Sequence, residues 1–297
     1  MLRLGLCCIF KNEPIKFRTT TVRHILTLSG SEQKKKLSAI CMHNADSLYR
    51  AYEYCLAGGI GCFRVFSQIL PLKTHPKLGY SVEELPDGEE IVARFRQCGK
   101  LLRDRGLRAS MHPDQFVVLS SPGPEVVHSS LSEIEYQAEV SEWIGADVVN
   151  IHGGGAYGNK AEALDRFAQN FLKLSARAQR LLTVENDDRI YSPQDLLPLC
   201  QKLKIPLVYD VHHHRCLKDS LSEKQAVNEA IKTWNREPMF HISSPLEGWN
   251  GPKPHRHHDF IDADDFPDYW KKLDVTVEVE AKAKELAVLK LKKDLQI

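Results

Sequence analysis

The segment DVVNIHGGGAYGNKAEALDRFAQNFLKLSARAQRLLTVEN, residues 147–186, decides the fold. It opens with a short apolar run that ends in His152 and closes with a second apolar run that reaches Glu185. The residues between the two runs have the composition and spacing of a helix. Two β-rich runs joined by a helix indicate parallel strands with a crossover connection. The segment therefore predicts one β–α–β unit with a polar side chain at the carboxyl end of each strand.

The same alternation of strand and helix fills the rest of the chain. We expect strands at 2–9, 61–66, 107–112, 147–152, 181–186, 205–210, 238–244 and 274–281, and helices at 34–57, 88–105, 124–144, 159–179, 193–203, 222–234, 263–272 and 282–295. Eight such units predict a closed (β/α)8 TIM barrel. A doubly wound open sheet is the alternative, but it usually carries a glycine-rich phosphate turn after its first strand. Residues 7–14, CCIFKNEP, show no such turn.

Composition sets the broad class of protein. The chain has 297 residues, 42% of them hydrophobic and 27% charged, which suits one domain over residues 1–297. A net charge of +1 gives no global signal for nucleic acid, although it leaves room for a local basic face. No apolar run is long enough for a membrane span, and the start, LRLGLCCIF, predicts a strand and no signal peptide. The eight scattered cysteines fit no zinc spacing and suggest reduced thiols in a cytoplasmic protein.

Side chains that ligate metals stand at the ends of six successive predicted strands. Each strand contributes one histidine or acid, and the six are His112, His152, Glu185, Asp210, His241 and Glu280. The active sites of TIM barrels lie at the carboxyl ends of the strands, so we expect all six at one mouth of the barrel. A lone histidine at a strand end is usually hydrogen-bonded structure, and Glu280 could pair with Lys282. Six such positions together indicate divalent cations that offset the repulsion between neighbouring acids.

The central pair of acids suggests how the ions are shared. Glu185 has two carboxylate oxygens and could bridge two ions, and two ions about 3.5–4 Å apart form the clamp used for displacement at phosphorus. His112 and His152 would complete the shell of one ion. Asp210, His241 and Glu280 would complete the shell of the other.

Three further histidines extend the candidate site. His213 in DVHHH could reach a third ion, with His257 of the loop PHRHHDF as its partner, and His75 in KTHP is another candidate for the first ion. Within the loop, His255 or His258 could replace His257. The alternative is that residues 212–214 and 255–258 are solvated loop. Because the set mixes imidazole with carboxylate and contains no thiolate, it favours Mn²⁺, Zn²⁺ or Fe²⁺ over Mg²⁺.

Two residues just past His112 have the chemistry of a DNA probe. In SMHPDQF, Gln115 and Phe116 place an amide beside an aromatic ring on a loop above the predicted site. An exposed pair of this kind can enter a base stack, where one side chain fills the gap and the other stacks on a base. The alternative is that Phe116 packs into the core and Gln115 caps a turn.

These motifs together resemble the UV damage endonucleases of the endonuclease IV-like superfamily. The stretches that carry the resemblance are LRLGL, FRVFSQILPLKTHP, SMHPDQF, NIHGGGAYGNK, TVENDDRIY, YDVHHH, FHISSP, HHDFIDADDF and VEVEAK, and they cover the chain from Met1 to about Lys284. The resemblance implies a DNA-repair hydrolase that excises UV damage. Such an enzyme would cut the phosphodiester immediately 5′ to a cyclobutane pyrimidine dimer or a 6-4 photoproduct in double-stranded DNA and leave a 3′-hydroxyl. We expect it to act as a monomer.

The resemblance also implies a site of up to three ions, typically Mn²⁺, with Co²⁺, Mg²⁺ or Zn²⁺ as alternatives. The first ion would be held by His75, His112, His152 and Glu185, the second by Glu185, Asp210, His241 and Glu280, and the third by His213 and His257. The catalytic residues would be Glu185, Asp210, His241 and Glu280. Gln115 and Phe116 match the pair that probes the duplex, although tyrosine often replaces the phenylalanine. Relatives carry lysine where this chain has Met239, so a polar contact near the metals is either lost or supplied from elsewhere.

Three other functions compete with this interpretation. An abasic-site endonuclease of the endonuclease IV type would use the same scaffold. A sugar isomerase or epimerase is also a metal-dependent barrel, but it usually needs one or two ions and a small enclosed pocket. A binding module would recognise irradiated DNA and never cleave it.

Overall fold

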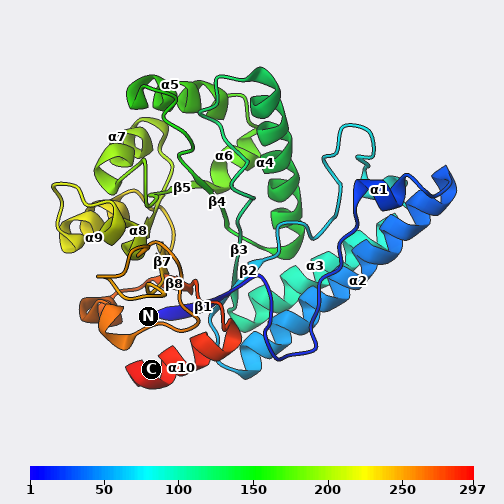
Figure 1. Ribbon diagram of the computed structural model, residues 1–297. Coiled ribbons are helices and arrows are strands. Elements are labelled where there is room, and N and C mark those ends of the chain that lie inside the picture. Colours follow the sequence, from blue (N-terminus) through cyan, green and yellow to red (C-terminus); the bar gives the residue numbers. More distant parts are fainter.

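Eight parallel strands close into a barrel in the computed structural model, which describes residues 1–297 (Figure 1). The strands are β1 (Arg3–Cys7), β2 (Cys62–Val65), β3 (Arg108–Met111), β4 (Val148–His152), β5 (Leu182–Glu185), β6 (Leu207–Asp210), β7 (Met239–Ile242) and β8 (Thr276–Val279). Each strand pairs with the next, and β8 pairs with β1 to complete the ring. The predicted TIM barrel is therefore confirmed, and the open sheet is excluded.

Helices surround the barrel and connect its strands. They are α1 (Val22–Ile25), α2 (Gly30–Ala57), α3 (Gly88–Arg105), α4 (Pro124–Ile144), α5 (Lys160–Phe171), α6 (Ala176–Leu181), α7 (Pro193–Leu203), α8 (Val211–Cys216), α9 (Glu223–Lys232) and α10 (Glu285–Leu295). Figure 1 shows α2 and α3 lying side by side on one flank of the barrel. None of these helices is both long and apolar enough to cross a membrane.

Helix boundaries follow recognisable end signals. The predicted bounds of α3, α4 and α7 agree with the structure. Gly106 and Gly145 follow α3 and α4 with φ of +68° and +75°, the left-handed conformation that glycine adopts without strain. Pro124 and Pro193 occupy the first positions of α4 and α7, where the absence of an N–H costs nothing.

Several helical segments differ from the sequence prediction, among them the short helix α1, where no helix was expected. The expected helix at 159–179 is two helices, because α5 ends at Phe171 and Ser175 caps a new helix. The expected helix at 263–272 is two short 3₁₀ turns, since Pro267 lies between them and cannot donate a backbone hydrogen bond. The helix α8 was not expected, because its six residues are too few to show a period.

The register of the strands brings the predicted ligands to a common level. His152 lies beside Glu185 across β4 and β5, and Asp210 lies beside His241 across β6 and β7. Because side chains alternate along a strand, the residues two positions earlier also point into the barrel, one layer deeper. The barrel interior therefore has an upper layer of histidines and acids and a second layer beneath it. The cysteines are all free, as expected, and most are buried.

Candidate metal centre

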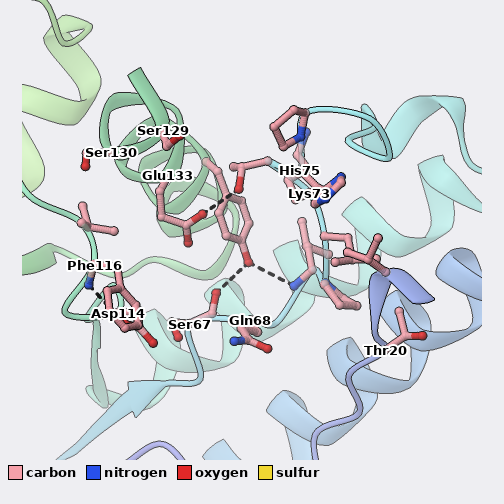
Figure 2. A pocket seen from close by; sticks show the side chains of 18 of the residues that line it. Thr20, Ser67, Gln68, Lys73, His75, Asp114, Phe116, Ser129, Ser130 and Glu133 are labelled. Carbon is pink, nitrogen blue, oxygen red and sulfur yellow. Dashed lines mark hydrogen bonds between the residues drawn. The ribbon is translucent and has the colours of Figure 1, made fainter. Parts of the chain in front are cut away.

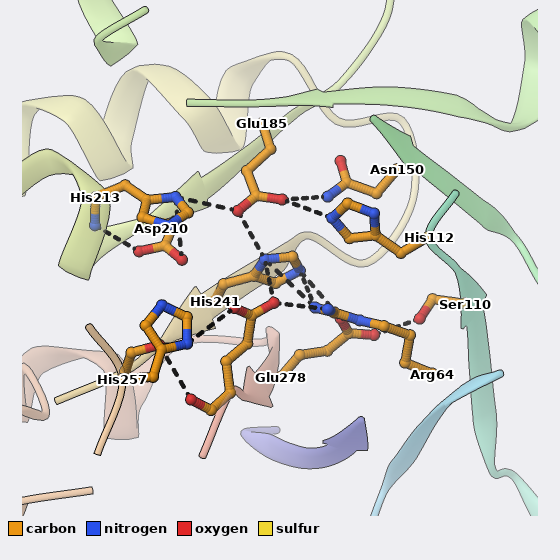
Figure 3. Close-up of polar contacts among 12 residues, drawn as sticks. Arg64, Ser110, His112, Asn150, Glu185, Asp210, His213, His241, His257 and Glu278 are labelled. Carbon is orange, nitrogen blue, oxygen red and sulfur yellow. Dashed lines mark hydrogen bonds and ion pairs between the residues drawn. The ribbon is translucent and has the colours of Figure 1, made fainter. Parts of the chain in front are cut away.

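Glu185 lies at the centre of the cluster, at the end of β5, and is almost wholly buried. One carboxylate oxygen, Oε2, lies 3.2 Å from Nε2 of His112 and accepts a hydrogen bond of 2.5 Å from the side-chain amide of Asn150. The other, Oε1, lies 3.1 Å from Nδ1 of His241 and 3.3 Å from Nδ1 of His213. Figure 3 shows these contacts spreading from the two oxygens to opposite sides. The carboxylate therefore faces two separate groups of side chains of the types that bind metals.

Two sets of side chains are close enough to share an ion. Their ligand atoms lie within 4.8 Å of one another in the set His112, His152 and Glu185, and again in the set Glu185, Asp210 and His241. Glu185 belongs to both sets. These clusters are consistent with divalent metal ions, and the donor set of imidazole nitrogen and carboxylate oxygen suits such ions.

Buried polar atoms without partners support a cation at this position. Nδ1 of His152 and Oδ2 of Asp210 are both buried, and neither has a hydrogen-bond partner. The other oxygen of Asp210 is used, because it accepts the backbone N–H of His213 at 2.8 Å and so caps α8. A buried polar atom left unpaired is costly, and most such atoms in proteins are satisfied. The residues present therefore fit a bound metal.

Backbone carbonyls orient two of the imidazoles. Nδ1 of His112 lies 2.9 Å from the carbonyl oxygen of Pro113, and Nδ1 of His213 lies 2.9 Å from that of Asn186. If each Nδ1–H donates to its carbonyl, each Nε2 keeps a lone pair for a metal. His241 has the opposite orientation, since its Nδ1 faces Glu185 and its Nε2 faces Glu278 at 3.0 Å.

Of the three loop histidines, His257 comes nearest to the cluster. Its Nδ1 lies 3.7 Å from Oε2 of Glu280, and its ring centroid lies 6.2 Å from that of His213. His258 instead accepts the backbone N–H of Phe260 at 3.0 Å and so holds the loop in shape. His255 lines a neighbouring pocket. The structure therefore brings His257 toward His213 and Glu280, and residues 212–214 are buried, not solvated.

The electrostatics of the cluster are those of a cation site. Burial would raise the pKa of Glu185, but His241 and His152 lower it well below its ordinary value. Burial would lower the pKa of His241, but Glu185 raises it to about 10. Burial lowers the pKa of His152, which favours its neutral form, the one that ligates metals. Glu280 pairs with Arg64 at 2.6 Å and not with Lys282.

No contact in the structure joins His75 to this cluster. His75 lines a separate cavity of about 600 Å³, and its Nδ1 accepts the backbone N–H groups of Lys77 and Leu78, each at 3.2 Å (Figure 2). The same cavity is lined by Phe116. The assignment of His75 to the first ion therefore remains a prediction.

Gln115 and Phe116 both lie on the surface. The side chain of Phe116 is 76% exposed, so the expectation that it packs into the core is wrong. The turn is held by Asp114, whose carboxylate accepts the backbone N–H of Phe116 at 3.2 Å. A single exposed ring does not by itself mark a contact surface, but this one lies at the edge of the cavity that His75 also lines.

Several residues of the site were not singled out from the sequence. They are Arg64, Asn150, His212 and Glu278, all buried and all within or just below the cluster. A signal existed for two of them, because Asn150 and Glu278 stand two positions before His152 and Glu280 and so share their side of the strand. His212 has a buried Nε2 without a partner and a ring 5.2 Å from that of His257.

Met239 makes no polar contact in this second layer. It is buried in a small apolar cluster with Cys62, Val148 and Val208. The polar contacts beneath the site involve β2, β3 and β8 instead, where Arg64 and Ser110 donate hydrogen bonds to Glu278. The side chain at position 239 therefore offers no polar contact to the site.

A basic hollow adjoins the cluster. It has a volume of about 510 Å³, and its lining includes Arg256, Lys282 and Lys284 beside His257 and Glu280. The positive side chains surround the edge of a strongly acidic and imidazole-rich centre. Such an arrangement can hold an anion next to a metal ion.

Comparison with known proteins gives a consistent result over the whole chain. The family model described as UV-endonuclease UvdE matches residues 2–297. A UV DNA damage endonuclease of Bacillus cereus (strain ATCC 10987 / NRS 248) is 34% identical over 284 residues, which cover 92% of this chain and 87% of that protein.

Solved structures agree with this match. The crystal structure of SacUVDE is 31% identical, superimposes with a TM-score of 0.87, and is covered to 98% by a match that spans 100% of this chain. Endonuclease IV from Thermus thermophilus has a TM-score of 0.61 at 17% identity, with coverage of 99% of this chain and 97% of that one. At 17% identity, the similarity to endonuclease IV is a similarity of fold alone.

Proposed function

The chain belongs to the UV-endonuclease UvdE family and is a UV-damage endonuclease, and we propose that it hydrolyses the phosphodiester immediately 5′ to a UV photoproduct at a multi-metal centre. The observation that carries the proposed chemistry is the position of Glu185, whose two oxygens face two sets of ligands. A shared carboxylate is what two neighbouring ions need if both are to contact one phosphate.

We assign the ligands from their contacts. The first ion would take His112, His152 and Glu185, and the family resemblance alone adds His75 to this set. The second would take Glu185, Asp210, His241 and Glu280, and the third would take His213 and His257. The unpartnered atoms of His152 and Asp210 support the first two sites. We propose Mn²⁺ because of the family resemblance, since the mix of imidazole and carboxylate argues against Mg²⁺ but suits Zn²⁺ and Fe²⁺ as well.

The protein residues have distinct tasks in the reaction. Ions held here would neutralise charge on the phosphoryl oxygens and activate a water molecule for in-line attack. Asn150 donates to Glu185 and fixes the carboxylate in the orientation that serves both sides. Asp210 ties the cluster to α8, which holds His213 in place. Arg256, Lys282 and Lys284 in the basic hollow would bind the DNA backbone beside the scissile bond.

Recognition of damage would depend on Gln115 and Phe116. A photodimer weakens stacking and pairing, so the damaged bases leave the duplex at lower cost than normal bases. The exposed ring of Phe116 would stack in the space that they leave, and Gln115 would contact the opposite strand. We propose cyclobutane dimers and 6-4 photoproducts as substrates. We further propose that residues 1–297 act as one domain and as a monomer in the cytoplasm.

A defined set of duplexes tests this proposal. Each duplex carries one cyclobutane dimer, one 6-4 photoproduct or one abasic-site analogue at the same position, and the enzyme is assayed with Mn²⁺, Co²⁺, Mg²⁺ or Zn²⁺. We expect a nick immediately 5′ to each photoproduct, a 3′-hydroxyl end and the fastest reaction with Mn²⁺. A preference for the abasic duplex would support an endonuclease IV-type activity. Tight binding to irradiated DNA without cleavage under any metal would contradict a nuclease.

A further inference from the structure

A second carboxylate on β8 lies directly beneath the proposed metal centre. Glu278 stands two residues before Glu280 and points into the same interior, but its side chain is only 1% exposed and cannot reach solvent. Strand pairing sets it beside His241 on β7. Figure 3 shows the imidazole of His241 between the carboxylates of Glu185 above and Glu278 below.

The ring of His241 is bound on both of its nitrogens. Nδ1 lies 3.1 Å from Glu185 and 3.5 Å from Glu280, both proposed ligands, and Nε2 lies 3.0 Å from Glu278. A neutral imidazole carries one proton, so only one nitrogen can offer a lone pair to a metal. If Nδ1 ligates the ion, the proton must be on Nε2, and that proton needs an acceptor.

Two groups lie near Nε2, and only one can accept its proton. The guanidinium of Arg64 lies 2.9 Å away, but every nitrogen of arginine is a donor. The carboxylate of Glu278 is the acceptor available. With Nε2 protonated, Arg64 directs its hydrogen bonds to Glu278 and Glu280, to which it already donates at 2.6 Å in each case.

Glu278 is itself held firmly. Besides Arg64, the hydroxyl of Ser110 donates to its Oε1. The register places Ser110 beside Arg64 on the adjacent strands β3 and β2, so both donors come from one side of the barrel. Arg64 and Ser110 therefore satisfy the hydrogen bonds of the Glu278 carboxylate, and Arg64 balances its charge. Among the proposed metal ligands, Glu278 contacts only His241.

We propose that Glu278 is a positioning residue of the metal centre, which accepts the Nε2 proton of His241 and so keeps the Nδ1 lone pair directed at the metal. Arg64 and Ser110 keep Glu278 in place. This inference rests on the proposed function, because it takes His241 to be a metal ligand. Metal-bound histidines commonly donate their second N–H to a carboxylate, and loss of that partner typically weakens metal binding about 10- to 100-fold.

Two substitutions separate proton acceptance from charge pairing. In Glu278→Gln the side-chain carbonyl still accepts the Nε2 proton but carries no charge, and in Glu278→Met no acceptor remains. Mn²⁺ binding to metal-stripped protein is measured by isothermal titration calorimetry. We expect the affinity of one site to fall modestly in Glu278→Gln and by about 10- to 100-fold in Glu278→Met. If Glu278 served only to balance Arg64, the two variants would bind equally weakly, and the proposal would be wrong.

The tautomer provides a second readout that needs no turnover. Zn²⁺-loaded protein with ¹⁵N-labelled histidine is examined by long-range ¹H–¹⁵N correlation, with the His241 signals assigned by their loss in His241→Gln. We expect a protonated Nε2 and a metal-bound Nδ1 in the wild-type protein. A proton on Nδ1 would overturn the proposal, as would a wild-type Mn²⁺ affinity in Glu278→Met.

Controls keep the outcome interpretable. Glu237 is a matched acid that pairs with Arg3 and Thr276 at the opposite end of the strands, so Glu237→Gln should leave Mn²⁺ binding unchanged. In Glu278→Met, Arg64 keeps Glu280 as its partner. If this variant does not fold, the tautomer of His241 in the wild-type protein still decides the proposal, because that measurement needs no substitution at position 278. Wild-type protein that bound no Mn²⁺ at all would instead refute the proposed metal-dependent function.

Discussion

Oε1 of Glu185 lies 3.1 Å from Nδ1 of His241, although the two residues belong to β5 and β7, which are not adjacent strands. The contact crosses the mouth of the barrel over the end of β6, which contributes Asp210. Three successive strands thus meet at one point, and this convergence requires the curvature of a closed barrel.

Replacement of the shared carboxylate should remove both activity and metal. In Glu185→Gln the amide cannot bind two cations, since it has one acceptor oxygen and no charge. Loss of a residue that only orients a ligand costs about 10- to 100-fold in metal affinity or activity, and loss of this ligand should cost more. We expect nicking of UV-irradiated plasmid to fall at least about 100-fold and the Mn²⁺ stoichiometry to drop. A folded variant that nicks at the wild-type rate would refute the assignment.

Metal loading should stabilise the fold by mass action. A free energy of unfolding about 2.7 kcal/mol higher is expected at a Mn²⁺ concentration 100 times the dissociation constant, provided that the unfolded chain binds no metal. Urea denaturation with and without Mn²⁺ measures the difference. Glu185→Gln should show a smaller gain, and an equal gain would place the bound ions elsewhere.

Truncation of the exposed aromatic should weaken the recognition of damage but leave the fold intact. Stacking of an aromatic side chain on a base contributes about 1–3 kcal/mol, so Phe116→Ala should weaken binding to a photodimer duplex by that amount. Phe116→Tyr should retain it. Fluorescence anisotropy in Ca²⁺ gives the affinity. Leu172→Ala, which removes another exposed apolar side chain, serves as the control and should have no effect.

The basic hollow predicts a change in salt dependence. If Lys282 contacts a phosphate, Lys282→Ala should weaken binding to damaged and undamaged duplexes alike and lower the slope of log K against log salt by about 0.9. Titrations between about 50 and 200 mM salt would give the slope, as order-of-magnitude conditions for such contacts. Lys293 lies in the last turn of α10, away from the hollow, and Lys293→Ala should leave the slope unchanged.

The partly buried acid Glu133, which lies outside the metal centre, predicts that a substitution there changes how stability depends on pH. Burial raises the pKa of Glu133 despite hydrogen bonds from Gln137 and Thr74. Because the folded pKa lies above the unfolded one, stability falls as pH rises from the unfolded pKa through the folded pKa. Glu133→Gln should not lose stability in this way, because glutamine does not ionise. We expect a higher melting temperature for the variant at pH 7 and none of this advantage below the unfolded pKa, as calorimetry across pH can show.

Much of the architecture could be predicted from the sequence because the signals are local. Glycine and proline mark the ends of α3 and α4, and apolar runs mark the strands. The strand-end residues could be predicted to converge because a parallel barrel puts all carboxyl ends at one mouth. The break between α5 and α6 could not be foreseen, since Leu172 and Lys173 are ordinary helix formers.

The charged residues beneath the metal centre could not be predicted from the sequence, for a different reason. Glu278 and Arg64 are charged residues inside otherwise apolar strands. The role of such a charge can be inferred only when its partner is known. Their pairing joins β2 to β8 through the barrel interior, a contact that no local pattern contains. The position of His75 depends likewise on how a long loop folds, which periodicity does not address.

The pairing of β8 with β1 closes the ring, and it also determines at which stage of synthesis the chain could begin to cut DNA. The final acid of the cluster, Glu280, arrives only with the last strand, so a chain still emerging from the ribosome holds an incomplete set of donors. If Glu280 is a metal ligand as proposed, we expect fragments that end before β8 to have no cutting activity.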